Sequence, residues 1–148
     1  MGNLHMSKDD RLIYMIFTAQ QKLRTYLKNA LTNRGVRVPP AQAGILFLLK
    51  ERDGQTMSEL SQVLSIDNST MTGLVDRLQR SGFVNRMASS KDRRISRIHV
   101  TPQGLEEIDR AKDVIKKVNE EIKSGFSRQE MDTFKRVLSS FFEKFNNG

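Results

Sequence analysis

The sequence has few of the residues on which most catalytic and metal sites depend: its 148 residues include no cysteine and only two histidines. Without cysteine there are no disulfides, thiolate nucleophiles, cysteine-based redox sensors or cysteine-ligated zinc and iron–sulfur sites. His5 and His99 cannot build a nucleophile–base–orienter set, and neither a glycine-rich phosphate loop nor a His-x-x-x-His pair is present. We therefore expect no catalytic residue, no metal site and no cofactor, and we predict that the protein is not an enzyme.

Long hydrophobic runs are also missing. The longest uncharged apolar stretch, 41–49, is far shorter than the ~18 residues of a membrane-spanning helix. The N-terminus lacks the basic and apolar regions of a secretory signal, and His5-Met6 suggests that residues 1–6 are a cloning remnant. These features predict a cytoplasmic protein without a membrane partner, in which residues 7–148 form a single domain.

Positive charge is distributed unevenly along the chain. The sequence has 25 Lys and Arg against 17 Asp and Glu, a formal net charge of +8. Residues 1–40 and 76–100 each have a net charge of +5, and in the second segment seven basic residues crowd into about twenty positions: Arg77, Arg80, Arg86, Lys91, Arg93, Arg94 and Arg97. Such crowding favours a polyanionic partner. A solvated charged face is the alternative that charge alone leaves open.

The two ends of the chain predict long helices. Apolar residues recur at three- and four-residue steps along 8–33, the spacing of one helix face. Thr101-Pro102 suits the start of a second long helix that extends to Gly125. Ser127 and Glu130 fit a capping box that opens a last helix.

These terminal helices carry more apolar surface than a small lobe can cover. Five of the eight phenylalanines lie within 126–145. Unpartnered apolar helix faces of this kind are typical of dimer interfaces. A purely monomeric core is the alternative.

The middle of the chain predicts three further helices in succession. Pro39-Pro40 suits the start of a buried helix that runs to about residue 49. Thr56-Met-Ser-Glu59 fits a capping box for a short helix ending near Leu64. Asp67 or Asn68 can cap the next helix, and Gly82 can end it in left-handed geometry.

A basic hairpin follows. Two strand candidates, 83–88 and 95–100, are separated by the polar segment 89–94. Helix, tight turn, helix and hairpin in this order predict a winged helix-turn-helix lobe over 40–100. The expected fold class is therefore mainly α with a small β-hairpin wing, and residues 7–38 and 101–148 supply N- and C-terminal dimerisation helices.

The second helix of the helix-turn-helix has two unlike faces. One face is apolar and should be buried: Met71, Leu74, Val75 and Leu78. The other is polar and should face outward: Asn68, Ser69, Thr72, Gly73, Asp76 and Arg80, with Arg77 on the flank. Short donors and acceptors near a helix N-terminus suit the major groove. A surface helix without function is the alternative.

The tip of the hairpin is Lys91-Asp92-Arg93-Arg94. An arginine is attracted into a minor groove by the negative potential there, and a neighbouring carboxylate can orient its long side chain. Asp92 can hold Arg94 in this way, while Lys91 and Arg93 contact phosphates. A merely solvated loop is the alternative.

These residues resemble the MarR family of bacterial winged-helix transcriptional regulators. The resemblance includes Met57-Ser-Glu-Leu-Ser61, residues 67–78, and Ser81-Gly-Phe-Val-Asn-Arg86. It continues through Lys91-Asp-Arg-Arg94 and Thr101-Pro-Gln-Gly104 and covers nearly the whole chain. The Asp-x-Arg element followed by Thr-Pro-x-Gly is its most specific part.

The resemblance implies a homodimer whose two recognition helices meet a pseudo-palindromic operator in double-stranded DNA. It assigns the recognition helix contacts to Asn68, Ser69, Thr70, Thr72 and Arg77, and the wing contacts to Asp92 and Arg94. It also implies a repressor released by a small aromatic or anionic effector. Members that sense peroxide through cysteine are excluded as models, because this chain has none.

The effector-binding residues cannot be assigned from the sequence. Tyr14, Phe17, Arg24 and Phe47 are candidates, although core packing explains the aromatic side chains equally well. For the function as a whole, the alternative is a winged-helix module without a specific operator, acting as an architectural DNA binder or binding a protein partner.

Overall fold

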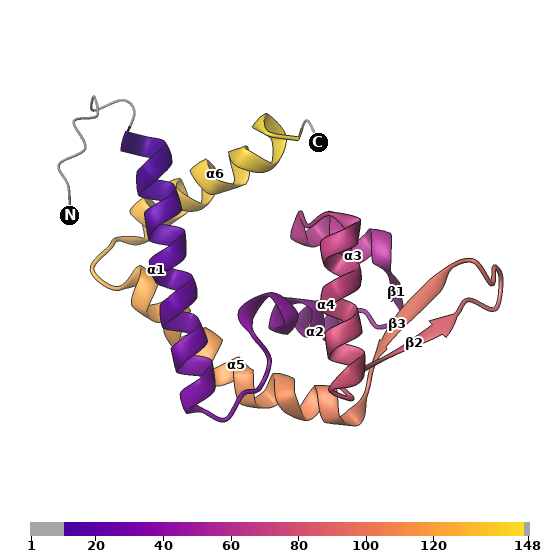
Figure 1. Cartoon of the computed structure of the whole chain (residues 1–148). Helices are drawn as coiled ribbons and strands as arrows, with labels where there is room; N and C mark the ends of the chain where they lie inside the picture. Colours follow the sequence, from indigo (N-terminus) through magenta and orange to yellow (C-terminus); the bar gives the residue numbers. More distant parts are fainter. Residues whose placement is uncertain (1–10, 147–148) are drawn as a thin grey trace. The chain divides into compact units, whose positions relative to one another are not determined.

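The computed structural model describes residues 11–146, so the predicted cloning remnant at 1–6 lies outside the described residues. The elements run in chain order α1 (Arg11–Asn33), α2 (Pro40–Glu51), β1 (Gln55–Thr56), α3 (Met57–Leu64), α4 (Asn68–Arg80), β2 (Val84–Ala88), β3 (Ser96–Val100), α5 (Pro102–Lys123) and α6 (Arg128–Lys144) (Figure 1). The chain divides after Val114, within α5, into two compact units. The predicted fold class, mainly α with a β-hairpin wing, is confirmed.

The first unit is built around a buried helix, α2. Pro39 has extended backbone angles and Pro40 occupies the first helical turn, where its missing N–H costs no hydrogen bond. The side chains of Ile45, Leu46 and Leu49 are at most 1% exposed. Burying each of these side chains stabilises the fold by about 1.5–3 kcal/mol.

Local polar contacts determine where α3 and α4 begin. The Thr56 hydroxyl accepts the N–H of Glu59 at 3.2 Å, which is one half of the predicted capping box. The Glu59 carboxylate does not return to Thr56 but pairs with the Arg52 guanidinium at 2.7 Å. Ser65 ends α3 in left-handed conformation with φ 53°, which creates the tight turn before α4. Asp67, rather than Asn68, is the N-cap of α4.

The hairpin belongs to a three-stranded antiparallel sheet with the order β1-β3-β2. In β1, Gln55 pairs with Ile98 and Thr56 with Arg97 of β3. Sequence analysis missed this strand, because two residues are too few to show a period-two pattern. The two predicted strands are present, each beginning one residue later than expected.

One charged side chain is fully buried in this unit. Glu107 of α5 is 0% exposed, and its Oε2 accepts the backbone N–H of Arg37 at 3.0 Å. Its Oε1 accepts a hydrogen bond from the Arg110 guanidinium at 3.3 Å. A buried carboxylate needs such partners, so Glu107 links α5 to the segment between α1 and α2.

The second unit comprises the end of α5, the turn at Gly125 and α6. The predicted capping box is confirmed: the Ser127 hydroxyl accepts the Glu130 N–H at 3.1 Å, and the Glu130 carboxylate accepts the Ser127 N–H at 2.9 Å. No side chain of α6 is buried among its described residues. This helix is therefore well capped but covers no core of its own.

The start of α5 lies against the end of α4. The Thr101 hydroxyl donates to the Gly82 carbonyl at 2.6 Å and accepts the Gly104 N–H at 3.1 Å. Gly82, at φ +82°, occupies the left-handed conformation predicted for it. A Cβ on Gly104 would lie 2.3 Å from the carbonyl oxygen of Phe83, which is backbone and cannot rotate away.

We predict that Gly104→Ala destabilises the protein by about 1–3 kcal/mol, because the backbone must shift to relieve the clash. Urea denaturation monitored by circular dichroism measures the change. Gly44→Ala is the matched control, since a Cβ there meets only Leu64 Cδ2 at the ordinary distance of 3.7 Å. Equal stability of the two variants would contradict the packing described here.

Candidate nucleic-acid interface

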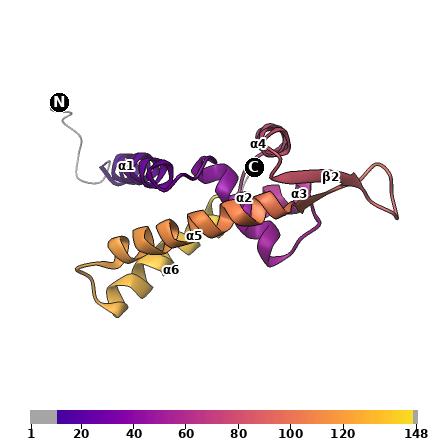
Figure 2. The ribbon, with the colours of Figure 1, turned by 90° about the horizontal axis from the view of Figure 1, so that it is seen from below.

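The α4 helix has the two faces that the sequence predicts. Its buried residues are Met71, Leu74, Val75 and Leu78. The proposed contact residues Asn68, Ser69, Thr70, Thr72 and Arg77 are all exposed. Figure 2 shows β2 beside α4 and the β2–β3 hairpin extending beyond the helices of the first unit. The recognition helix candidate and the wing therefore belong to one compact body.

Asp67 organises the N-terminal turn of α4. Its Oδ1 accepts the Thr70 N–H at 2.7 Å and the Ser69 hydroxyl at 2.7 Å, and its Oδ2 accepts the Thr70 hydroxyl at 2.9 Å. These hydrogen bonds, that from the Thr70 backbone N–H first, lower the pKa of the Asp67 carboxyl to about 2. The carboxylate is therefore ionised at neutral pH and acts only as an acceptor.

The other members of the predicted contact set lie along the same exposed face. The Thr72 hydroxyl donates to the Asn68 carbonyl at 2.8 Å, one turn back along the helix. Arg77 and Arg80 lie in the last turn, where their positive charge interacts favourably with the negative end of the helix dipole. Polar groups thus occupy the N-terminal part of α4, and positive charge its C-terminal part.

Asp76 faces outward, with its side chain 46% exposed, and it also pairs with the wing, which the sequence did not predict. Its Oδ1 accepts a hydrogen bond from the Arg86 guanidinium of β2 at 2.6 Å. The Arg86 side chain is 30% exposed, so the pair is only partly screened by solvent. This contact connects α4 directly to the first strand of the wing.

The predicted pair at the tip of the wing is confirmed as a contact. The Asp92 Oδ1 accepts the backbone N–H of Arg94 at 3.0 Å and lies 3.4 Å from Arg94 Nε. The Arg94 side chain is nevertheless 92% exposed. Lys91 and Arg93 are exposed in the same loop. The tip therefore presents three cations and orients one of them.

Sequence analysis missed the polar contacts at the base of the wing. Asp53 accepts the backbone N–H of Val100 at 2.8 Å and lies 3.0 Å from His99 Nδ1. Arg97 donates to the Gly54 carbonyl at 2.9 Å, so this member of the basic cluster is engaged within the protein. The partners are more than forty residues apart in sequence, and no local pattern could have paired them.

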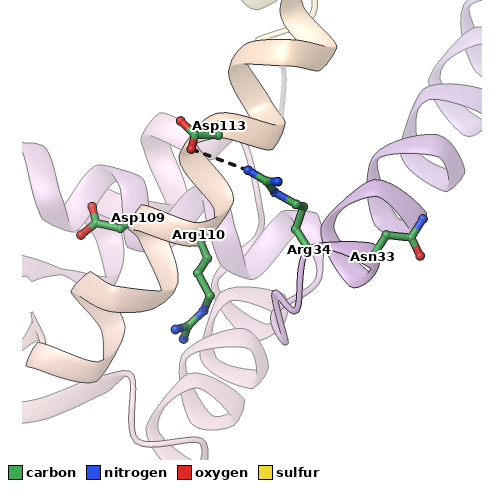
Figure 3. A pocket seen from close by; sticks show the side chains of 5 residues that line it. All are labelled: Asn33, Arg34, Asp109, Arg110 and Asp113. Carbon is green, nitrogen blue, oxygen red and sulfur yellow. Dashed lines mark ion pairs between the residues drawn. The ribbon is translucent and has the colours of Figure 1, made fainter.

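A pocket of about 530 Å³ lies in the same unit, beside the end of α1 and α5. It is lined by Asn33, Arg34, Asp109, Arg110 and Asp113 (Figure 3). Arg34 points toward Asp113, with 3.8 Å between the guanidinium and the carboxylate. The lining is charged, with two arginines and two aspartates, and contains no aromatic ring.

Residues 11–146 contain neither a metal-binding cluster of acidic and histidine side chains nor a membrane-spanning helix. No cluster of three or more histidine, aspartate or glutamate side chains in this range could hold a metal ion. None of its helices is both long and apolar enough to span a membrane.

The Asp67 cap makes stability depend on pH. Because the folded pKa is depressed from 3.8 to about 2, the stabilisation is fully present above pH 4 and is lost as the pH falls through 2. We predict that Asp67→Asn, which retains a cap acceptor, removes this contribution. Urea denaturation of the wild type and of Asp67→Asn between pH 5 and pH 2 measures the free energy of unfolding of each. The difference between the two proteins should become smaller as the pH falls. Parallel curves would contradict the assignment.

Comparisons with known proteins place this geometry in a family. The model of the MarR family matches residues 38–96, from just before α2 to the start of β3. The HTH-type transcriptional regulator YsmB of Bacillus subtilis is 33% identical over 109 residues, which cover 72% of each chain. The organic hydroperoxide resistance transcriptional regulator of the same organism is 23% identical and covers 93% of this chain and 89% of its own.

The solved structures agree in fold. CouR bound to a 23-mer DNA duplex superposes with a TM-score of 0.82 at 23% identity, covering 95% of this chain and 99% of CouR. CouR from Rhodococcus jostii RHA1 bound to p-coumaroyl-CoA gives a TM-score of 0.77 at 23% identity, with 92% and 94% covered. The sequence match to YsmB and to the family model, on a helix-turn-helix with a wing, shows that the chain belongs to the MarR family of transcriptional regulators.

Proposed function

We propose that the protein is a cytoplasmic, homodimeric repressor that binds a specific operator in double-stranded DNA. One observation carries the proposal: the exposed polar face of α4 and a wing tip with an oriented arginine lie in the same compact unit. A helix of this kind fits the major groove, and an arginine at a wing tip fits the adjacent minor groove. Residues 40–100 would form the DNA-binding lobe.

The proposed contacts divide by chemistry. Asn68, Ser69, Thr70, Thr72 and Arg77 would face base edges and the flanking backbone in the major groove. Lys91 and Arg93 would contact phosphates, whose neutralisation makes binding depend on salt. Arg94 would enter the minor groove, with Asp92 holding its side chain at the required angle.

The apolar surfaces of the terminal helices support a dimer. In α1, the side chains of Leu12, Met15 and Phe17 are each more than 60% exposed. In the second unit, Ile122, Phe126, Met131 and Phe134 line an apolar pocket together with Glu130. A second copy of the chain would cover such surfaces. Residues 7–38 and 101–148 would thus be dimerisation segments, and the operator would be pseudo-palindromic.

We further propose that a small aromatic or anionic ligand releases the repressor from DNA, and that the protein is not an enzyme. CouR has been captured with DNA and with p-coumaroyl-CoA, an aromatic thioester that carries negative charge. Tyr14 and Phe17 of α1 are exposed, and their rings make an edge-to-face contact with centroids 6.4 Å apart. Such rings would be available to an aromatic ligand.

The proposal predicts preferential binding to one DNA sequence. The purified protein should bind duplexes selected from a random library about 10³-fold or more tightly than a scrambled duplex at 50–200 mM salt. Fluorescence anisotropy gives the affinities, and sedimentation gives one dimer per site. Equal binding to all duplexes would indicate an architectural binder, and no binding would favour a module for protein partners.

The wing assignment is tested by Arg94→Ala, which should weaken operator binding by about 1–3 kcal/mol and leave the dimer intact. Arg93→Ala is the matched control from the same loop. As a phosphate contact it should weaken binding to all sequences uniformly and lower the salt slope by about 1. Unchanged operator affinity of Arg94→Ala in the same titration would contradict the assignment of the wing.

A further inference from the structure

The N-terminal part of α4 exposes three hydroxyl groups, and each donates its proton inside the protein. Ser69 Oγ donates to Asp67 Oδ1 at 2.7 Å, and Thr70 Oγ1 donates to Asp67 Oδ2 at 2.9 Å. Thr72 Oγ1 donates to the carbonyl of Asn68 at 2.8 Å. The three side chains are all exposed, so their oxygen atoms remain accessible from outside.

The partners of these hydroxyls hold them in this state. Asp67 is ionised, and hydrogen bonds to a charged acceptor are roughly twice as strong as those between neutral groups. If Ser69 or Thr70 turned its proton outward, the Asp67 carboxylate would lose one of its hydrogen-bond donors. That loss is unfavourable when the negatively charged DNA approaches the carboxylate. The Asp67 carboxylate therefore caps the helix and also fixes the direction of the Ser69 and Thr70 hydroxyl protons.

A hydroxyl has one proton and two lone pairs. Once the proton is donated, the group can only accept further hydrogen bonds. In the major groove the donors are the N6 amino group of adenine and the N4 amino group of cytosine, whereas guanine N7 and O6 and thymine O4 are acceptors. Phosphate oxygens at neutral pH are also acceptors.

We infer that Ser69, Thr70 and Thr72 form an acceptor-only edge that selects exocyclic amino groups of adenine or cytosine in the operator. The inference rests on the proposed binding of α4 in the major groove. The same edge disfavours guanine and thymine acceptors at the positions it faces, and it makes no phosphate contacts. Asn68 differs, because its side-chain amide carries donors as well as an acceptor and can pair with adenine at both N6 and N7.

The test removes one amino group of the DNA at a time. In the selected operator, each adenine is replaced by purine, which lacks the N6 amino group, and each cytosine by 2-pyrimidinone, which lacks the N4 amino group. Binding is measured for the full-length wild type and for Ser69→Ala, Thr70→Val and Thr72→Val. Because a weakened base pair affects all proteins alike, the ratio between wild type and variant isolates the protein contact.

We expect at least one amino deletion to weaken wild-type binding about three- to tenfold, the loss of one hydrogen bond, and to have no effect on the variant lacking the matching hydroxyl. The purine and 2-pyrimidinone arms identify whether the base is adenine or cytosine. Replacing guanine by 7-deazaguanine, which removes the N7 acceptor, should give the same ratio for wild type and all three variants.

Asp67→Asn tests whether the Asp67 carboxylate fixes the direction of the two hydroxyl protons. Asparagine can still accept the Thr70 N–H, but its NH₂ group takes the place of one oxygen, so one hydroxyl must turn its proton elsewhere. This variant should discriminate less between amino-bearing bases and guanine or thymine at the positions facing Ser69 and Thr70. Glu51→Gln should retain the wild-type discrimination, since Glu51 is exposed at the end of α2 and is not one of the proposed DNA contacts.

The outcomes separate the inference from the proposed function. Operator preference together with amino deletions that cost the same in wild type and all three variants would overturn the inference alone. A methylphosphonate in the DNA backbone that weakens binding of the wild type but not of a variant lacking one hydroxyl would also overturn it, because contact with a phosphate requires an outward proton. Absence of any operator preference would overturn the proposed function, and the inference with it.

Discussion

The apolar face of α4 has to be buried, and this requirement governs the lobe around it. Met71, Val75 and Leu78 are fully buried, and the helix packs against α2, α3 and β2. In an α-helix, burying one side fixes the direction of the other. The same packing that stabilises the lobe therefore turns the hydroxyl and amide groups of α4 toward solvent, where DNA can reach them.

Polar contacts then fix the wing relative to that helix. Arg86 pairs with Asp76 on α4, Asp53 binds the backbone of Val100, and Thr101 links the end of α4 to the start of α5. Each contact joins two different elements or loops, and the Arg86–Asp76 and Thr101–Gly82 hydrogen bonds are partly buried. The tip itself is different, since Asp92 and Arg94 are neighbours whose pairing is local and largely solvent-exposed. A fixed base with an exposed tip suits a side chain that must enter a groove.

Asp67 connects the stability of α4 with the chemistry of its exposed edge. Its carboxylate satisfies a backbone N–H that the helix leaves unpaired, and the same two oxygens accept two hydroxyl protons. A capping residue usually matters only for stability. Here it also determines whether the neighbouring side chains offer donors or acceptors to a partner.

The sequence by itself determined the helices, their caps and the two faces of α4, because helical periodicity and capping act within a few residues. It also determined the Asp92–Arg94 contact, which spans two positions. Only the tertiary structure decided the third strand, the engagement of Asp76 and Arg97 within the protein, and the burial of Glu107. These features depend on which distant segments meet, and hydrogen bonds between them leave no periodic trace in the chain. The direction of the hydroxyl protons on α4 needed both the sequence and the structure. The residues involved are close together in the sequence, but only their geometry shows which group donates and which accepts.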